Sequence, residues 1–138
     1  MSEVPCLFCD IAGGVVPARI VSNDNIAFAF LDRSPLFKGH VLVAPHRHAV
    51  TLADLDADLV GPFFARVQRL AAVMPKALGC DGTFVAINNV VSQSVAHLHV
   101  HIVPRRRKDG LRGFFWPRVK YASDAEADEY AQRITDAL

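Results

Sequence analysis

The sequence predicts an antiparallel α+β domain on three observations. Five short runs rich in β-branched and aromatic residues are separated mostly by short connections, as in a sheet whose neighbouring strands run in opposite directions. The two long segments with helical spacing lie outside these runs, so strand and helix do not alternate as they would in a parallel sheet. The chain has 138 residues, 51% of them hydrophobic, which is enough for one domain with a substantial core.

The elements in the first third of the chain are recognised by the residues that end them. An Asn/Asp cluster at 22–25 lies between two β-type runs and is typical of a hairpin turn. The expected elements are, in order, a helical turn at 8–12 stopped by Gly13 and Gly14, two strands within 18–32, a loop at 34–39, and a strand at 40–44 ended by Pro45.

The main helix is expected between Asp56 and Gly79. Asp56 is a suitable N-cap and Gly79 a suitable stop. Pro62 and Pro75 lie inside this segment, so the sequence predicts either a kink or a late helix start at Pro62. The apolar residues with helical spacing are Leu59, Phe63, Val67, Leu70, Val73 and Ala77.

The last elements complete the sheet and add a C-terminal helix. Residues 83–90 and 97–104 are expected to form two further strands, and residues 123–136 a helix. The chain contains no internal repeat, low-complexity tract or linker. We therefore expect one domain over residues 1–138, with a core at about 6–107 and a C-terminal extension at 108–138.

Charge and hydropathy exclude several classes of protein. The net charge of +1 gives no general attraction to nucleic acid or to an anionic membrane. No apolar run is long enough to span a membrane, and the N-terminus does not resemble a signal peptide. Three cysteines are too few for a secreted disulfide framework. These features predict a cytoplasmic protein with no membrane partner.

The charge is unevenly distributed near the C-terminus. Residues 105–120 are basic and residues 122–138 are acidic, which suggests an anion-facing stretch followed by a solvated helix. Two solvated faces are an equally good interpretation. Phe114, Phe115 and Trp116 lie within the segment 105–121 and could grip a large substrate or a nucleic acid, but a dimer contact is the preferred interpretation.

Residues 97–103 read HLHVHIV, with three histidines at alternate positions. Successive side chains of a strand point to opposite faces, so His97, His99 and His101 are expected to share one face while the apolar residues between them enter the core. Imidazole titrates near neutral pH and can serve as nucleophile, base or acid, which suits covalent catalysis at phosphorus. A metal site is the second interpretation. Three merely tolerated histidines are the least favoured one, because unpaired buried rings cost free energy.

The sequence resembles the histidine triad (HIT) superfamily. The resemblance covers most of residues 6–107 and rests on the triad together with other motifs. It implies a five-stranded antiparallel sheet with two helices, a homodimer, and a site for a purine nucleotide. The matching motifs are CLFCDI at 6–11, FLD at 30–32, GHVLVAPHRH at 39–48 and QSVAHLHVHIVPR at 93–105.

The resemblance also implies residue roles. His99 matches the nucleophile that attacks the α-phosphorus and forms a nucleotidyl-histidine intermediate, with His97 and His101 flanking it as catalytic histidines. Asp32 matches the acidic residue that binds the ribose hydroxyls, although a turn aspartate before Ser34 is the alternative. The remaining substrate contacts implied are Gln93, Ser94, which also acts on the leaving group, and Asn88 or Asn89.

A zinc site is implied beside the triad. Cys6 and Cys9 have the spacing of a metal pair or a redox pair. A zinc-binding branch of the family combines such a pair with histidines that match His48 and His97, which would make the zinc structural. Two buried cysteines are the alternative. Of the other residues considered, Cys80 is expected to be an inert small residue, His40 to hydrogen-bond within the active site, and His46 to lie on the surface.

One loop departs from the family pattern. Many relatives carry glycines where this chain has Val90, Val91 and Ser92. A loop without glycine is not expected to adopt positive φ easily, so phosphate binding by backbone N–H groups would be altered.

The predicted function is that of a nucleotide hydrolase or transferase. The substrate class would be purine nucleotide phosphoramidates, anhydrides or dinucleoside polyphosphates. A non-catalytic nucleotide-binding adaptor is the alternative, and a nucleic-acid-binding module is disfavoured by the near-zero net charge.

Overall fold

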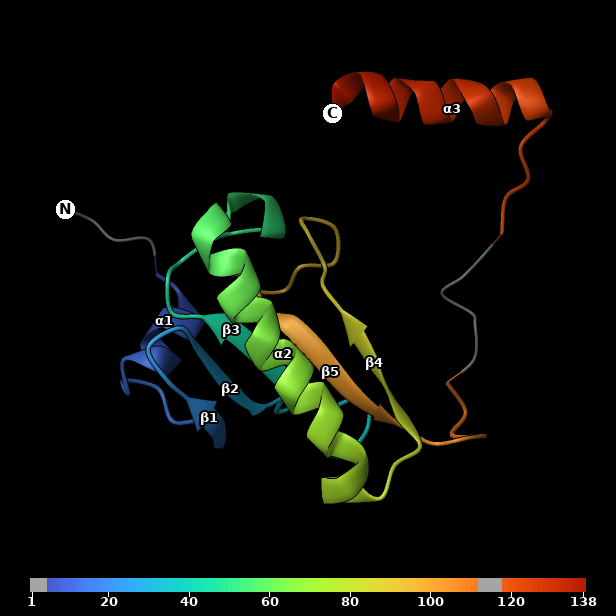
Figure 1. The fold of residues 1–138 in the computed structure, drawn as a ribbon. Coiled ribbons are helices and arrows are strands. Elements are labelled where there is room, and N and C mark those ends of the chain that lie inside the picture. The colour runs from blue at the N-terminus through green and yellow to red at the C-terminus, as the bar shows by residue number, and fades with distance from the viewer. Residues whose placement is uncertain (1–4, 112–117) are drawn as a thin grey trace. The chain divides into compact units, whose positions relative to one another are not determined.

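The computed structural model describes residues 5–111 and 118–138, and the chain divides into two compact units between Arg107 and Lys108 (Figure 1). The first unit contains the sheet and every predicted site residue. The second contains helix α3, Asp124–Ala137, which begins one residue later than predicted and has Ser123 as its N-cap. The aromatic residues Phe114, Phe115 and Trp116 lie outside the described residues.

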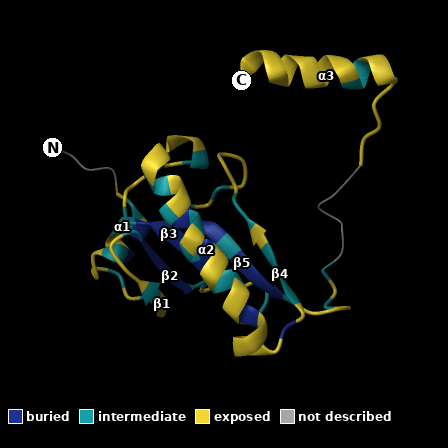
Figure 2. Cartoon of the chain, viewed as in Figure 1, coloured by how far each residue is buried: buried dark blue, intermediate teal, exposed yellow. Residues whose placement is uncertain are grey.

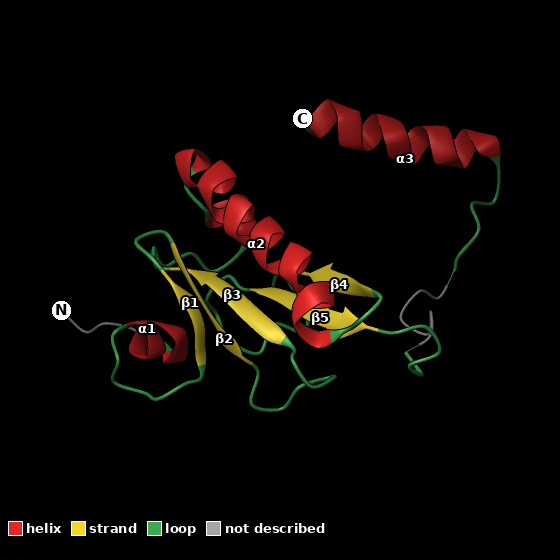
Figure 3. Ribbon diagram, turned by 60° about the horizontal axis from the view of Figure 1, so that its bottom comes forward, coloured by secondary structure: helices red, strands yellow, loops and turns green. Residues whose placement is uncertain are grey.

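The sheet has five antiparallel strands, as the sequence predicts, and the structure arranges them in the order β1-β2-β3-β5-β4. Figure 3 shows helix α2 lying across one side of this sheet and the short helix α1 on the other. Strand β5 therefore lies inside the sheet, between two antiparallel neighbours. The bounds are α1 Leu7–Ala12, β1 Ile20–Asn23, β2 Ala27–Leu31, β3 Val41–Pro45, the 3₁₀ helix η1 Leu52–Asp54, α2 Ala57–Leu78, β4 Gly82–Ala86 and β5 Val100–Arg105.

Each face of the sheet packs against its own apolar cluster, and Figure 2 shows β2, β3 and β5 as the buried centre. Under α2, the cluster joins Phe63 and Val67 of the helix to Val43 of β3 and Val100 of β5. On the opposite face, Phe8 and Ile11 of α1 pack with Phe28, Phe30, Leu42 and Ala44. Burial on both faces makes the central strands apolar throughout, which is why β3 reads VLVAP without polar alternation.

The β1–β2 turn is held by Asp24. Its Oδ1 accepts the backbone N–H groups of Ile26 and Ala27 at 2.8 and 2.9 Å. Its Oδ2 accepts from Arg66 Nε of α2 at 3.0 Å. These bonds stabilise the carboxylate, and the backbone bonds in particular keep the pKa of Asp24 below its ordinary value. The predicted hairpin is confirmed, and this turn is also tied to the main helix.

Helix α2 does not start late at Pro62, which is one of the two possibilities that the sequence allows. It starts at Ala57, so a late start at Pro62 is wrong. Pro62 lies within the first two turns, where its missing N–H removes only one intrahelical bond. Asp56 is the N-cap residue, but its side chain makes no capping bond. Its carboxylate instead lies 3.4 Å from Arg47 Nε.

The last two strands are shorter than predicted. Strand β4 ends at Ala86 rather than residue 90, and β5 begins at Val100 rather than residue 97. Strand β3 ends at Pro45, which has no N–H for a ladder, and the N–H of Leu98 donates to Ala49 O at 2.7 Å instead. The first two triad histidines therefore lie in the segment that leads into β5, and only His101 is a strand residue.

Gly39 is required where the chain enters β3. Its φ is +99°, and a Cβ built on it would lie 2.5 Å from Leu78 Cδ1. We expect Gly39→Ala to lower the free energy of unfolding by about 1–2 kcal/mol, the cost of a left-handed conformation for an L-residue. Urea unfolding measures this change. Gly61→Ala in α2, where a Cβ meets nothing within 4 Å, is the matched control and should not lower stability. An unchanged urea midpoint for Gly39→Ala would contradict the requirement for glycine at this position.

The helices of the described residues can be compared with the length and apolar character of a membrane span. Within residues 5–111 and 118–138, none combines the length and apolar character needed to cross a bilayer. The longest of them, α2, is also interrupted by charged side chains such as Arg66 and Arg69.

Candidate functional site

The triad occupies the sheet face that α1 covers. Leu98, Val100 and Ile102 are fully buried in the cluster under α2, so the alternating histidines face the other way, as predicted. The ring of Phe8 packs edge-on against both His97 and His99, with centroid distances of 5.9 and 4.9 Å. Alternation therefore persists through 97–99 although these residues lie outside the strand.

The hydrogen bond made by His99 fixes its tautomer. His99 Nδ1 lies 2.7 Å from the carbonyl oxygen of His97. A carbonyl oxygen only accepts, so Nδ1 carries the proton and the lone pair of the neutral ring is on Nε2. In the neutral form of this ring, Nε2 is therefore the basic, nucleophilic nitrogen.

A chain of three hydrogen-bonding groups fixes the tautomer of His101 in the same way. The backbone N–H of Leu36 donates to His40 Nδ1 at 3.1 Å, so neutral His40 carries its proton on Nε2. His40 Nε2 lies 3.0 Å from His101 Nδ1 and donates to it. His101 therefore holds its own proton on Nε2, where it can be offered to an acceptor. The predicted hydrogen bond of His40 within the site is present.

Burial keeps these rings uncharged. Desolvation, with a smaller contribution from the neighbouring His99 and His40, lowers the pKa of His101 from its ordinary 6.5 to about 4. The pKa of His40 is also lowered, mainly by burial, although the Asp32 carboxylate opposes this shift. At neutral pH the rings of His40 and His101 are therefore neutral and can act as hydrogen-bond donors and acceptors.

The lowered pKa of His101 makes stability depend on pH. Below 6.5 the unfolded chain protonates this ring, whereas the folded chain does so only near pH 4. The contribution of His101 to stability is therefore complete above pH 6.5 and declines as pH falls toward 4. We expect the thermal midpoint of His101→Asn to fall less steeply than that of the wild type across this window. Parallel pH profiles for the two proteins would show that His101 does not cause this loss of stability.

Asp32 has one oxygen in a turn and the other near the histidines. Its Oδ1 accepts the N–H of Ser34 at 2.9 Å, which is the turn contact considered as the alternative role. Its Oδ2 lies 3.8 Å from His40 Nε2. The turn contact therefore orients the carboxylate at the edge of the His40–His101 pair, with Oδ2 on the side of His40.

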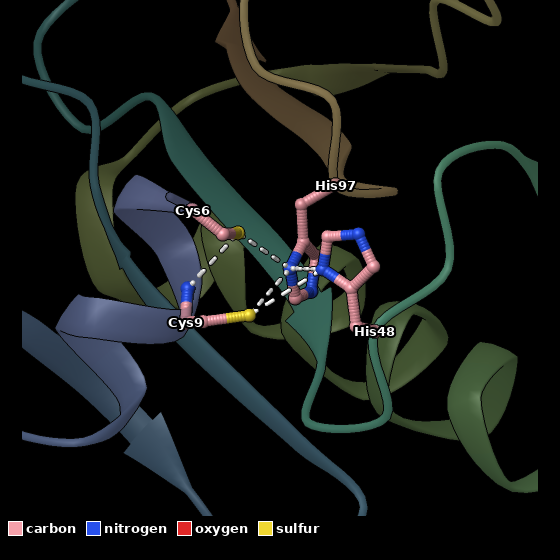
Figure 4. Close-up of side chains that lie close together, drawn as sticks. All are labelled: Cys6, Cys9, His48 and His97. Atoms are coloured by element: carbon pink, nitrogen blue, oxygen red, sulfur yellow. Dashed lines mark hydrogen bonds between the residues drawn. The ribbon is translucent and has the colours of Figure 1, made fainter. Parts of the chain in front are cut away.

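The two cysteines meet His48 and His97 in a second cluster, shown in Figure 4. Cys6 Sγ lies 3.3 Å from His97 Nδ1, and Cys9 Sγ lies 3.5 Å from the same nitrogen and 3.4 Å from His48 Nδ1. The two histidine Nδ1 atoms are 3.1 Å apart. All four ligand atoms lie within 4.8 Å of one another. The residues assigned to a metal from the sequence are therefore brought together.

The tautomer of His97 fits a zinc ligand. His97 Nε2 lies 2.8 Å from the carbonyl oxygen of Pro45 and so carries the proton, which leaves the Nδ1 lone pair facing both sulfur atoms. Two thiolates and two imidazoles form a common tetrahedral zinc set. The residues present therefore suggest a zinc site.

A second group, Asp32, His40 and His101, fits a metal less well. Their ligand atoms also lie within 4.8 Å of one another. However, His40 Nδ1 already accepts the Leu36 N–H, so binding a metal through Nε2 would require an imidazolate. The hydrogen-bond chain accounts for this group without an ion.

The loop after β4 is held against the segment before η1. Asn89 Oδ1 accepts the N–H of Leu52 at 2.9 Å, while Gln93 Oε1 accepts the N–H of Val90 at 3.1 Å and Gln93 Nε2 donates to Val50 O at 2.5 Å. The side chain of Asn89 is therefore engaged within the protein. Gln93 uses its oxygen and one of its two N–H donors in the same way. Asn88 and Ser94 are exposed.

The expectation about φ in this loop is wrong. Val90 and Ser92 adopt positive φ angles of 69° and 61° although neither is glycine. The hydrogen bonds that Gln93 makes to Val90 N–H and to Val50 O hold the loop in this conformation, which offsets the local strain. Absence of glycine therefore does not prevent left-handed backbone here.

The fold and these histidines define a histidine triad protein. Residues 13–108 match the HIT domain family, which is more than half of the chain. The protein therefore belongs to the HIT family. An uncharacterised HIT-like protein of Methanocaldococcus jannaschii is 40% identical over 107 residues, covering 76% of this chain and 82% of that protein. An adenosine 5′-monophosphoramidase of Schizosaccharomyces pombe is 32% identical over 114 residues, covering 81% and 83%.

Solved structures show the same fold. SMU.412c from Streptococcus mutans matches with a TM-score of 0.87 and 33% identity, covering 99% of this chain and 87% of that one. A Zn-bound histidine triad family protein from Mycobacterium smegmatis matches with a TM-score of 0.73 and 32% identity, covering 96% and 97%. The predicted fold class is thereby confirmed, and the presence of zinc in one similar structure agrees with the Cys–His cluster.

Sequence reasoning missed the backbone groups of the site. The carbonyls of Pro45 and His97 and the N–H of Leu36 set the tautomers of His97, His99 and His40, and His40 in turn sets that of His101. No residue type indicates such a role, since every residue but proline has both groups.

Proposed function

We propose that the protein hydrolyses or transfers the nucleotidyl group of purine nucleotide phosphoramidates, anhydrides or dinucleoside polyphosphates. His99 Nε2 attacks the α-phosphorus, the bond from phosphorus to the leaving group breaks, and a nucleotidyl-histidine forms. Water, or another acceptor in a transfer, then attacks the phosphorus and releases His99. The hydrogen bond from His99 Nδ1 to the His97 carbonyl carries this proposal, because it puts the free lone pair on Nε2.

The flanking groups would serve the same step. His101, with its proton on Nε2, would donate to a phosphoryl oxygen and stabilise the charge that develops there. Asp32 Oδ2 would accept from the ribose hydroxyls, while the remaining N–H of Gln93 and the hydroxyl of Ser94 would contact phosphate and leaving group. His97 would position His99, because its own ring is fully buried and both of its nitrogens are engaged.

The zinc would have a structural role. Four protein ligands leave no open coordination position for a substrate. Bound zinc would supply cross-linking, joining the N-terminal residues Cys6 and Cys9 to His48 and His97. The proposed zinc therefore contributes to the shape of the site and not to the chemical step.

The test is AMP release by the purified protein. An adenosine phosphoramidate, a diadenosine polyphosphate and an adenylylsulfate would be compared, and zinc content determined on the same preparation. Release of AMP from one of them supports the enzyme and identifies its leaving group. AMP binding without turnover of any would instead favour the nucleotide-binding adaptor.

Asn88 is the better candidate of the two asparagines for a substrate contact. Both asparagines are exposed, but the Oδ1 atom of Asn89 already accepts the N–H of Leu52. We expect Asn88→Ala to raise KM several-fold with little change in stability, and Asn89→Ala to lower the free energy of unfolding by about 1 kcal/mol through loss of a hydrogen bond. Steady-state kinetics and urea unfolding of both variants measure this contrast. A KM effect confined to Asn89→Ala would reverse the assignment.

We also propose a cytoplasmic homodimer, with residues 1–138 forming one HIT domain around a core at about 6–107. Support for pairing comes from the apolar side chains that α2 and the edge strand β4 expose. Val60 and Val73 of α2 and Val85 of β4 are 38%, 44% and 44% exposed. Sedimentation of the purified protein would determine its oligomeric state.

A further inference from the structure

We propose that the Cys6–Cys9 pair is a redox switch for the nucleophile, and that His97 transmits its state. The inference rests on the proposed function, since it concerns control of the same site. His97 is the residue at which the two clusters meet. Its Nδ1 faces both cysteine sulfurs, its Nε2 is bonded to Pro45 O, and its carbonyl oxygen accepts the proton of His99 Nδ1.

The position of the His97 carbonyl depends on its ring. The ring is fully buried and is held from one side by sulfur and from the other by Pro45. His97 lies outside the strand ladder, which begins only at Val100, and the nearest backbone bond is that of Leu98 N–H to Ala49 O. The contacts of the His97 ring are therefore a large part of what fixes the backbone between residues 97 and 99. A change at the sulfurs would move the acceptor on which the His99 tautomer depends.

The geometry of the cysteines allows them to form a disulfide. Cys6 is the N-cap of α1 and Cys9 is its third helical residue, and Cys6 Sγ accepts the N–H of Cys9 at 3.3 Å. The two sulfurs are no more than 4.8 Å apart, and both residues are partly exposed. A disulfide requires about 2.05 Å between sulfurs, a distance that side-chain rotation can approach over this separation. Both thiols are therefore close to each other and accessible to a small oxidant.

The oxidant would be a peroxide. One thiolate attacks a peroxide oxygen, the O–O bond breaks, and a sulfenic acid and one water form. The second thiolate displaces the hydroxyl from that sulfur as the second water, and the S–S bond forms. The two sulfurs together lose two electrons, the peroxide gains them, and two protons complete the waters. A thiol reductant reverses the change.

Oxidation removes both sulfur contacts of His97 Nδ1. The disulfide also no longer supplies two of the four ligand atoms of the cluster, so zinc should be released. The ring and carbonyl of His97 lose their fixed position, and His99 is no longer held with its proton on Nδ1. We expect turnover to fall about tenfold to a hundredfold, the usual effect of losing a group that orients a functional histidine. Reduction with zinc present should restore it.

The experiment follows three signals during titration of the reduced, zinc-loaded protein with hydrogen peroxide. Intact mass reports the disulfide, a chromogenic chelator reports released zinc, and ¹⁵N NMR of the imidazoles reports the tautomer of His99. We expect loss of the Nδ1–H tautomer in step with disulfide formation. A complete disulfide with unchanged His99 signals and unchanged turnover would overturn the proposal.

Control variants separate the switch from general oxidation. Cys80→Ala removes the cysteine that is buried in the core under α2, and this variant should respond to peroxide as the wild type does. Cys9→Ser cannot form the disulfide, and its His99 signals should not respond to peroxide. A response that persists in Cys9→Ser would contradict the role of the pair. If oxidation changes the His99 tautomer but the reduced protein releases no AMP from any substrate, the proposed function fails and the coupling stands.

Discussion

Replacing His99 by alanine is expected to abolish AMP release while leaving nucleotide binding nearly intact. The substitution removes the only atom proposed to bond with phosphorus, and loss of a covalent nucleophile costs about four orders of magnitude or more in kcat. Binding should persist because Asp32, Gln93 and Ser94 are unchanged. Steady-state turnover and calorimetric titration with AMP measure the two effects on the same preparation.

His46→Ala is the matched control for this substitution. His46 lies on the same connection as His48, but its Nε2 bonds to Asn23 Oδ1 at 2.8 Å, outside the triad. We expect this variant to keep wild-type turnover. A mass increase equal to one nucleotidyl group, trapped on wild type and absent from His99→Ala, would identify the intermediate. Loss of AMP binding together with turnover in His99→Ala would instead assign this ring to folding.

Removal of zinc is expected to lower the thermal midpoint by about 10 °C or more. A ligand present at a thousandfold excess over its Kd stabilises the native state by about 4 kcal/mol. In a domain of this size, 1 kcal/mol corresponds to roughly 2–8 °C. A strong chelator should produce this shift in the wild type, because the ion would join α1 to the segment that carries the triad.

The double variant Cys6→Ser, Cys9→Ser should start at the lower midpoint and not respond to the chelator. Cys80→Ala removes a buried cysteine outside the cluster and should keep the response to chelator, even though the loss of packing lowers its starting midpoint. Metal analysis should find about one zinc per chain in the wild type and none in the double variant. A wild-type protein that contains no zinc and ignores the chelator would contradict the zinc site.

Residue type and spacing predicted the clusters well. Alternation at period two correctly separated the three histidines from the apolar residues between them, because neighbouring side chains of extended backbone point to opposite sides even outside a ladder. The CxxC spacing and the family resemblance together predicted that Cys6 and Cys9 lie beside His48 and His97. The structure brings the ligand atoms of these four side chains within 4.8 Å of one another. A local pattern sufficed for the triad face, whereas the Cys–His cluster also required the family resemblance.

Element ends and tautomers could not be predicted in this way. Strand β5 begins no earlier than Val100, because Pro45 opposite has no N–H and the N–H of Leu98 donates to Ala49 O. Both causes involve residues that are distant in sequence from β5. Asp56 occupies the expected cap position, yet its carboxylate lies beside Arg47 rather than on the helix. The proton positions on the histidines depend on backbone groups of other segments, which the sequence does not reveal.

The left-handed loop at Val90 and Ser92 affects how much order the protein must gain when it binds a ligand. Glycine would reach these φ angles of 69° and 61° freely, but it would also visit many others before binding. Valine and serine, held by the side chain of Gln93, restrict the loop to fewer conformations beforehand. Less conformational entropy is then lost on association, so this loop favours ligands that fit it as it stands over those that require it to adapt.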